Sequence, residues 1–248
     1  MAQLLHGDCL EEMKNLEDNS IDFIFCDLPY GQTSCKWDCC IDLEQFWKEI
    51  MRIKKLNTPI FMTTTTKFGV SLINSAPKKL KFFDLVWKKS CPTAFLLSKK
   101  FPLRSHEMIY AFYEKLPFYD LSSHKHKFIK EEPEKKYVGK PVMRENTTYG
   151  DVVSYEIKER KNGESRYEPP LPTTMLEIKS TRGKHSTEKP VALMEWLLKY
   201  YSKEGDVVLD PTMGSGSTCI ACKNMNRNFI GIEKDDEIFE VACERIWG

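Results

Sequence analysis

The chain has 248 residues, of which 41% are hydrophobic and 29% charged, and its formal net charge is only +1. This length accommodates one large domain with a sizeable core, or two small ones. No apolar run approaches the roughly 20 residues that cross a bilayer, and the N-terminal residues lack the basic start and apolar core of a secretory signal, so we expect a globular protein without a membrane anchor.

Apolar runs and helical patterns alternate in the first 116 residues. The stretch 42–55 places Phe46, Ile50 and Ile53 on one face, which predicts an amphipathic helix. Short runs rich in β-branched and aromatic residues predict strands at 4–7, 21–26, 58–62, 82–87 and 107–113. The last two runs follow one another without a clear helix between them, so we expect an antiparallel hairpin at a sheet edge.

The middle of the chain, residues 117–184, is rich in Lys, Glu, Pro, Ser and Thr, and its most polar part reads HKHKFIKEEPEKKYVGKP. It does not resemble another strand–helix unit. We therefore expect an insertion at 117–184 that separates two parts of one catalytic domain, residues 1–116 and 185–248.

Strand and helix patterns alternate again near the C-terminus. Helices are predicted at 191–201, 217–225 and 236–246, and strands at 206–210 and 228–233. Such alternation predicts an α/β fold with a mostly parallel sheet that is covered by helices on both faces.

The predicted strand 21–26 ends in the sequence DLPYG, residues 27–31. A turn alone needs no tyrosine. Tyr30 offers a face on which a planar ring can stack, Asp27 can accept hydrogen bonds from an amine, and Pro29 stiffens the segment. The motif therefore indicates a site that grips a flat, amine-bearing group.

A second motif, VVLDPTMGSGST, covers residues 207–218. A strand that ends in Asp210, followed by a glycine turn that opens a helix, is typical of a nucleotide-cofactor site. Gly214 and Gly216 let the backbone approach a ligand closely, and Glu233 ends the next strand, where a carboxylate can bind two ribose hydroxyls. A tight structural turn would explain the glycines alone, but the strand, turn, helix and downstream acid together favour a ligand.

The second motif lacks the third glycine of a dinucleotide site. Asp210 would repel a diphosphate and attract a cation, which favours S-adenosylmethionine over NAD. The stretch before the helix at 191–201 contains His185, Thr187 and Lys189, which are donors suited to the methionine carboxylate. A helix-capping or surface role is the alternative for His185.

The two motifs are expected to meet in space. In an open α/β sheet, ligands bind beyond the carboxyl ends of the strands where the strand order reverses. If strands 206–210 and 21–26 are neighbours, Asp210 and Asp27 flank one crevice, with the cofactor over the glycine turn and the acceptor at DLPYG.

The same motifs resemble a known family. DLPYG is similar to the DPPY motif of DNA amino-methyltransferases, and DPTMGSGST is similar to their cofactor motif. The order of the two motifs resembles that of the circularly permuted beta class. GDCLEEM, YGQTSCKWD, HSTEKPVALMEWL and NFIGIE extend the similarity, and residues 97–119 look especially like small adenine methyltransferases of phages and prophages. Residues 120–180 are unmatched, and in the family this region belongs to target recognition.

The resemblance implies a Rossmann-like, S-adenosylmethionine-dependent methyltransferase and gives roles by position. Asp27, Leu28, Pro29 and Tyr30 would form the catalytic motif. Leu28 replaces a proline of the family but keeps the backbone carbonyl that would accept the second amine hydrogen. Asp8 would contact the adenine of the cofactor. The full set of implied cofactor-binding residues is Asp8, Cys9, Asp27, His185, Thr187, Lys189, Asp210, Thr212, Gly214, Ser215, Gly216, Thr218 and Glu233.

The uneven distribution of charge suits double-stranded DNA as the substrate. Residues 1–50 carry 3 Lys/Arg against 11 Asp/Glu, whereas residues 76–145 carry 16 against 8. A basic surface attracts a polyanion, so Lys99, Lys100 and Arg104 are candidates for phosphate contacts, although a solvated lysine-rich surface has the same composition. Many relatives dimerise and some have a partner restriction endonuclease; the sequence decides neither for this chain.

The expected target is the N6 amine of adenine, because Asp27 heads the motif where Ser would favour cytosine N4. Cytosine N4 is the nearest alternative, and RNA or a protein amide is more distant; an amide target usually goes with Asn in place of Asp27. An NAD oxidoreductase and a nucleic-acid-binding module with an inactive cofactor pocket are further alternatives.

The nine cysteines are expected to be reduced thiols in the cytoplasm of a bacterium or a phage-infected bacterium. Cys35, Cys39 and Cys40 lack a second CxxC pair and nearby histidines, so no metal site is predicted.

Overall fold

The computed structural model describes residues 1–29, 41–93, 95–127, 142–144, 152–154, 165–181 and 188–248. The chain divides into two compact units. The larger unit comprises residues 1–120 and 173–248, and the smaller unit comprises residues 121–172.

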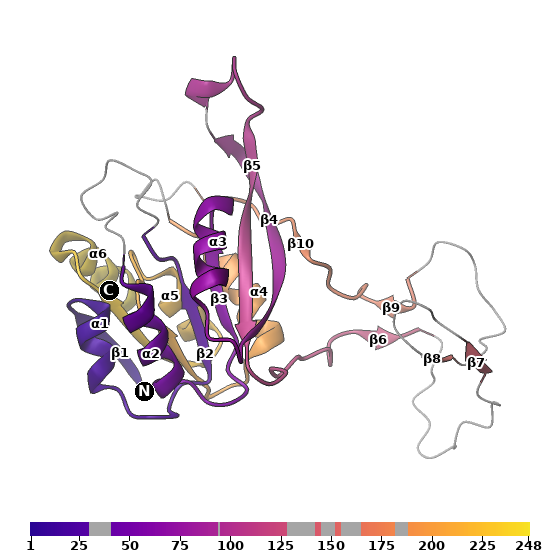
Figure 1. Ribbon diagram of the computed structural model, residues 1–248, viewed down its shortest axis with the longest axis horizontal. Helices are drawn as coiled ribbons and strands as arrows, with labels where there is room; N and C mark the ends of the chain where they lie inside the picture. The colour runs from indigo at the N-terminus through magenta and orange to yellow at the C-terminus, as the bar shows by residue number, and fades with distance from the viewer. Residues whose placement is uncertain (30–40, 94, 128–141, 145–151, 155–164, 182–187) are drawn as a thin grey trace. The chain divides into compact units, whose positions relative to one another are not determined.

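The described part of the larger unit is built on an eight-stranded sheet (Figure 1). From one edge to the other, the strands are β1 (Ala2–His6), β12 (Asn228–Glu233), β11 (Val207–Asp210), β2 (Phe23–Cys26), β3 (Ile60–Thr64), β5 (Arg104–Tyr113), β4 (Lys81–Thr93) and β10 (Met175–Leu176). The strands from β1 to β3 are parallel, whereas β5 is antiparallel to both β3 and β4. The predicted α/β sheet with an antiparallel hairpin is confirmed.

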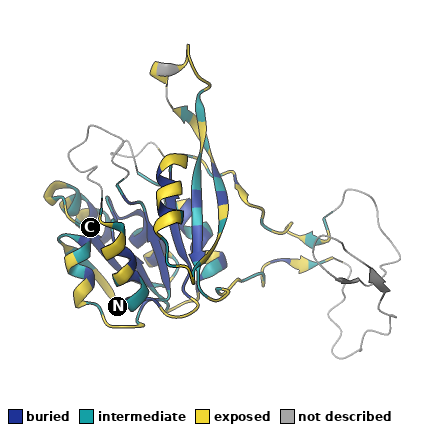
Figure 2. Ribbon diagram, viewed as in Figure 1, coloured by how far each residue is buried: buried dark blue, intermediate teal, exposed yellow. Residues whose placement is uncertain are grey.

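Helices cover both faces of the sheet (Figure 2). One face is covered by α1 (Cys9–Glu12), the short 3-10 helix η1 (Met13–Asn15), α2 (Leu43–Ile53) and α3 (Thr66–Ser75). The other face is covered by α4 (Val191–Tyr201), α5 (Ser217–Asn224) and α6 (Asp236–Trp247).

The central strand β2 belongs to both layers of the core. All four of its residues are buried, because successive side chains of a strand point to opposite faces and both faces are covered. Phe23 and Phe25 pack in the cluster with α4 to α6, whereas Ile24 and Cys26 pack in the cluster with α1 to α3. The strand that precedes Asp27 is therefore fixed from both sides.

Helix α3 was not predicted from the sequence. Its sequence, TKFGVSLINS, contains Gly69 and three β-branched residues, which weaken helix propensity. Thr65 caps the helix by accepting a hydrogen bond from the N–H of Phe68. A Cβ at Gly69 would lie 2.4 Å from a ring carbon of Tyr110, so the glycine lets the helix pack closely on β5.

The inserted region differs from the predicted boundaries 117 and 184. Strand β10 lies within these limits, yet it pairs in parallel with β4 of the main sheet. The indole N–H of Trp87 also donates to the carbonyl of Ile178 at 2.8 Å. Residues 173–181 therefore belong to the larger unit.

The smaller unit contains two short antiparallel pairs among its described residues. The first pairs β6 (Lys125–His126) with β9 (Tyr167–Glu168), and the second pairs β7 (Val142–Arg144) with β8 (Val152–Ser154). Among all the described residues of the chain, no helix is both long and apolar enough to cross a membrane.

Candidate active site

The two sequence motifs meet at one edge of the sheet. Strand β11 pairs in parallel with β2, with Val208 opposite Phe23 and Leu209 opposite Ile24. Asp210 and Asp27 consequently leave the sheet at the same carboxyl edge, and Thr212 Oγ1 accepts a hydrogen bond from the N–H of Asp27 at 3.3 Å. The predicted adjacency of the two strands is confirmed.

Asp210 is a buried carboxyl at the end of β11, only 3% exposed. It accepts hydrogen bonds from Thr218 Oγ1 at 2.6 Å and from the N–H of Thr212 at 3.2 Å. Burial raises the pKa of Asp210 to about 7, with smaller contributions from the charges of Asp27 and Glu233, although the two hydrogen bonds act in the opposite direction. A cationic group next to Asp210 would favour its ionised form.

The glycine turn that follows Asp210 has two different glycines. Gly214 and Gly216 both have left-handed backbone angles, with φ of 52° and 82°. A Cβ at Gly216 would lie 2.7 Å from Cδ1 of Ile246, so this glycine lets α6 pack against the start of α5. A Cβ at Gly214 would meet nothing within 4 Å. Gly214 therefore borders open space.

Glu233 ends β12 and is held by backbone groups. Its Oε2 accepts from the N–H of Gly214 at 3.0 Å, and its Oε1 accepts from the N–H groups of Lys234 and Asp235 at 2.8 and 2.9 Å. The carboxylate is thus fixed beside the glycine turn.

Asp8 lies at the same edge, because β1 pairs with β12 and places His6 opposite Glu233. It caps α1 by accepting from the N–H of Leu10 at 3.0 Å, and Lys234 Nζ lies 3.0 Å from its second oxygen. Burial opposes the charge of Asp8, but these two partners hold its pKa below the usual value. Burial raises the pKa of the neighbouring Cys9 to about 12, so its thiol is neutral.

Asp27 is held by side chains from distant parts of the chain. Its Oδ1 accepts a hydrogen bond from Thr63 Oγ1 of β3, and its Oδ2 lies 2.5 Å from Nζ of Lys189. Lys189 also lies 3.8 Å from Oε1 of Glu107 on β5. Burial lowers the pKa of Lys189, but the negative charges of Asp27 and Glu107 raise it, and the balance is above the usual value. Lys189, expected at the cofactor, thus contacts the acceptor motif.

The next two residues of the acceptor motif anchor it. The side chain of Leu28 is buried in the cluster with α1 to α3, and Pro29 is half-buried. Packing of Leu28 fixes its backbone carbonyl next to Asp27. Tyr30, His185, Thr187 and the cysteines Cys35, Cys39 and Cys40 lie outside the described residues.

Some residues of the site were missed by sequence reasoning. Thr63 and Glu107 belong to neither the acceptor motif nor the cofactor motif, and only their positions on β3, next to β2, and on β5, next to β3, could have indicated them. Arg245 of α6 is a further case, because it donates to the carbonyl and hydroxyl of Ser215 and lies 2.8 Å from Glu188. Ser215, expected at the cofactor, is therefore fixed by the C-terminal helix.

The three basic residues expected to contact DNA lie on the β4–β5 hairpin or at its tip, which projects beyond the rest of the larger unit (Figure 1). Lys99 and Lys100 are exposed, whereas Arg104 is half-buried at the start of β5. Phe95, Leu96 and Phe101 are also exposed on this tip, which includes the 3-10 helix η2 (Phe95–Leu97). The tip therefore combines positive charge with apolar surface.

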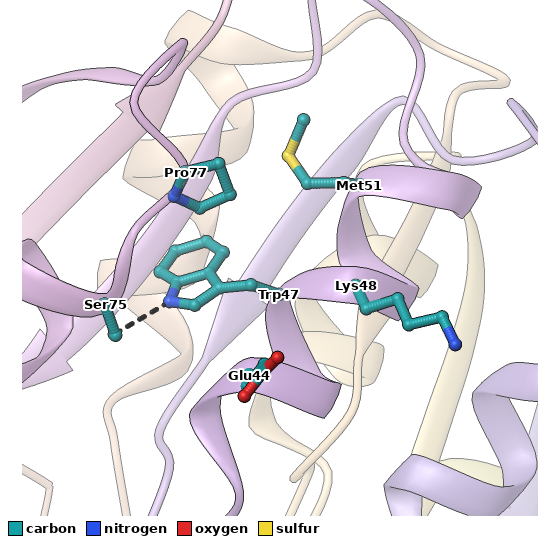
Figure 3. A pocket seen from close by; sticks show the side chains of 6 residues that line it. All are labelled: Glu44, Trp47, Lys48, Met51, Ser75 and Pro77. Atoms are coloured by element: carbon teal, nitrogen blue, oxygen red, sulfur yellow. Dashed lines mark hydrogen bonds between the residues drawn. The ribbon is translucent and has the colours of Figure 1, made fainter.

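A surface pocket of about 460 Å³ lies away from this site, against α2 and the end of α3 (Figure 3). Its lining residues are Glu44, Trp47, Lys48, Met51, Ser75 and Pro77, and the indole N–H of Trp47 donates to Ser75 Oγ at 3.0 Å. The pocket contains one carboxylate. Across the described residues, no three or more His, Cys, Asp or Glu side chains are arranged to hold a metal ion.

Comparison with solved structures defines the class of fold. The structure of the M1.HpyAVI complex with S-adenosylmethionine aligns over 100% of both chains with a TM-score of 0.64 and 24% identity. The PvuII DNA methyltransferase, described as cytosine-N4-specific, aligns over 99% of this chain and 86% of its own chain, with a TM-score of 0.68 and 13% identity. The fold is that of the S-adenosylmethionine-dependent methyltransferases.

Sequence comparison defines the family. Residues 21–244 match the model of the DNA methylase family, N6_N4_Mtase. Type II methyltransferase M.HinfI of Haemophilus influenzae is 28% identical over 98% of this chain and 67% of its own length. Type II methyltransferase M2.MboI of Moraxella bovis is 25% identical over 98% of this chain and 86% of its own length. The chain belongs to this family of N6/N4 DNA methyltransferases, whose methyl donor is S-adenosylmethionine.

Proposed function

We propose that the protein transfers a methyl group from S-adenosylmethionine to the N6 amine of an adenine flipped out of double-stranded DNA. The observation that carries this proposal is the meeting of Asp27 and Asp210 at one edge of the sheet, linked through Thr212. An acceptor for an amine and a site for a cationic cofactor then share one crevice, as direct transfer requires.

The residues of the glycine turn suit the cofactor. When bound, S-adenosylmethionine supplies an electrophilic methyl group on a sulfonium centre. Asp210 would offer a buried carboxyl to the positively charged end of the cofactor. The open space at Gly214 would let the cofactor approach the protein backbone closely. Glu233, which accepts from the N–H of Gly214, would bind the ribose hydroxyls, and Asp8, just beyond the end of the adjacent strand β1, would contact the adenine.

The acceptor motif suits an exocyclic amine. Such a nitrogen is a poor nucleophile because its lone pair is delocalised into the ring. Asp27 and the carbonyl of Leu28 accept its two hydrogens and favour a tetrahedral nitrogen with a localised lone pair, while Tyr30 stacks on the base. The rate then comes from positioning and from hydrogen bonds that strengthen in the transition state. No covalent enzyme intermediate is needed, which agrees with the neutral thiol of Cys9.

The amine is inaccessible inside a stacked duplex, so the base must be flipped out at a cost of a few kcal/mol. Lys99, Lys100 and Arg104 of the hairpin would offset this cost through phosphate contacts. We assign target recognition to the inserted smaller unit, residues 121–172.

Adenine is proposed because aspartate heads the acceptor motif. The fold itself does not discriminate, since a cytosine-N4-specific enzyme shares it. The test is to incubate the purified protein with S-adenosylmethionine and DNA, digest the DNA and separate the nucleosides by mass spectrometry. N6-methyladenine should dominate. N4-methylcytosine as the main product would contradict the adenine assignment, and methylation of RNA but not DNA would contradict the substrate class.

A further inference from the structure

Four charged side chains of alternating sign lead from the hairpin to the acceptor motif. Lys89 Nζ of β4 lies 3.0 Å from Glu107 Oε2 of β5, and Glu107 Oε1 lies 3.8 Å from Lys189 Nζ. Lys189 in turn lies 2.5 Å from Asp27 Oδ2. The side chains of Lys189 and Glu107 are only 11% and 12% exposed, so water screens these interactions weakly.

This arrangement places Lys189 on the oxygen that a target amine would use. Thr63 donates to the other oxygen of Asp27, so an entering amine competes with Thr63 or with Lys189. A buried ammonium group that loses its carboxylate is strongly destabilised. Glu107 provides a second carboxylate within reach.

We propose that Lys189 is a positioning residue that contacts Asp27 in the free enzyme and moves onto Glu107 when the target amine binds, so that Glu107 sets how readily Asp27 accepts the amine. The inference deepens the proposed function and rests on it. It also reassigns Lys189 from the cofactor carboxylate to the acceptor motif.

The charge balance supports such a movement. Asp27 and Glu107 carry two negative charges, and Lys89 and Lys189 carry two positive charges, so a shift of one ammonium group by a few ångströms changes no net charge. Asp210 of β11 also acts on the charge of Lys189, and its own pKa of about 7 makes its charge vary near neutral pH. Thr63 of β3, whose side chain is uncharged, also contacts Asp27.

The first test compares Glu107→Gln with Glu107→Asp. Glutamine keeps the size of the side chain but removes the second carboxylate for Lys189, so we expect the single-turnover rate of methyl transfer to fall by about 10- to 100-fold. Aspartate should restore part of the rate. The affinity for S-adenosylmethionine, measured by calorimetry, should change by less than about threefold in both variants, since neither touches the cofactor residues. An unchanged rate in Glu107→Gln would overturn the proposal.

The second test uses Lys189→Met and Lys189→Arg. If Lys189 positions Asp27, the cofactor affinity of Lys189→Met should stay within about threefold of the wild type. The pH below which its single-turnover rate falls should be higher than in the wild type, because a positive charge near Asp27 is missing. In Lys189→Arg the pH below which the rate falls should return towards the wild-type value. A loss of cofactor affinity of more than about tenfold with an unchanged pH profile would return Lys189 to the methionine carboxylate and overturn the proposal.

A binding readout separates this inference from the proposed function. Once the methylated sequence has been mapped, duplexes carrying adenine or purine at the target position differ only in the amine. The wild type should bind the adenine duplex more tightly, and Glu107→Gln should lose this preference. Equal preference in both proteins would contradict the role of Glu107. Failure of the wild type to methylate DNA would instead contradict the proposed function.

Discussion

The two halves of the candidate site are held by different kinds of interaction. The cofactor half, around Asp210 and Glu233, relies largely on backbone N–H groups and on residues a few positions away, such as Thr212 and Thr218. The acceptor half relies on side chains that approach Asp27 from residues 36 and 162 positions away. Local sequence therefore determines most of the first half, whereas the second half exists only when the strands are assembled.

The largest expected effect comes from a substitution that disrupts the acceptor half alone. Asp27→Ala removes an acceptor that is needed most in the transition state, so kcat should fall by about 10²–10³ or more, as when one hydrogen-bonding group is removed from an active site. The affinity for S-adenosylmethionine should stay close to that of the wild type in calorimetry.

The control for this variant is Asp18→Ala, since Asp18 is an exposed acid that pairs with Arg52 away from the site. It should leave kcat unchanged. A strong loss of cofactor affinity in Asp27→Ala would mean that the two halves are not separable.

The hairpin tip carries the three basic residues that we propose to contact DNA. Removing Lys99, Lys100 and Arg104 together should make the plot of log affinity against log salt concentration less steep by about 2 to 3, because each phosphate contact contributes about 0.9 to the slope. The measurement is a salt series of DNA-binding titrations.

Lys14 and Lys48 are matched controls on the acidic N-terminal part of the chain. Replacing both by alanine should leave the salt slope unchanged. A slope that is equal in the hairpin variant and the wild type would locate the DNA footprint elsewhere.

The affinity of the cofactor half for S-adenosylmethionine should depend on pH. Below pH 7 Asp210 is largely protonated and attracts a cation weakly; above pH 7 it is ionised. Affinity for S-adenosylmethionine should therefore rise by up to about tenfold per pH unit as the pH approaches 7 from below, and binding should release a proton.

Calorimetry in buffers of different ionisation enthalpy measures this proton. Asp210→Asn keeps the size of the side chain but cannot ionise, so its weaker binding should not vary with pH between 5 and 8. A pH dependence that persists in Asp210→Asn would assign the effect to another group.

The smallest expected effect separates the two glycines of the turn. Alanine at either position adopts an unfavourable left-handed conformation, which costs about 1–2 kcal/mol of unfolding free energy. The free energy of unfolding of Gly216→Ala should be about 1 kcal/mol lower than that of Gly214→Ala, because the Cβ at position 216 also meets Ile246. Urea denaturation measures both. Gly214→Ala should lose cofactor affinity despite its greater stability; equal stability of the two variants would contradict the distinction.

The sequence predicted the fold well where local patterns decide it. The parallel strands, the hairpin and the adjacency of β11 and β2 follow from apolar runs, helix patterns and the rule for ligand sites in open sheets. Helix α3 was not predicted because Gly69 lowers the helix propensity of this segment. Its packing against Tyr110 cannot be predicted from local sequence. Strand β10 was not predicted because it is only two residues long, which is too short to show an alternating pattern.

The site was predictable to the same degree. Asp210, Gly214 and Glu233 stand at fixed spacing within consecutive elements, so sequence reasoning placed them at one ligand. Lys189 was also recognised as a site residue, but its contact with Asp27 depends on how α4 begins relative to β2 and β5. Glu107 has no motif at all, since its role arises from pairing of β5 beside β3.

The return of the chain through β10 has a consequence for protein engineering. The smaller unit is connected at Asp120 and Thr173, and hydrogen bonds of the larger unit fix the chain next to both points: the N–H of Asp120 donates to the carbonyl of Tyr200, and the N–H of Val86 donates to that of Thr174. A foreign segment grafted between these two anchors would leave the eight strands of the main sheet and both halves of the candidate site in place. Exchange of this insert between family members would therefore test the role in target recognition that we propose for the smaller unit, and the expected outcome is methylation of a different DNA sequence.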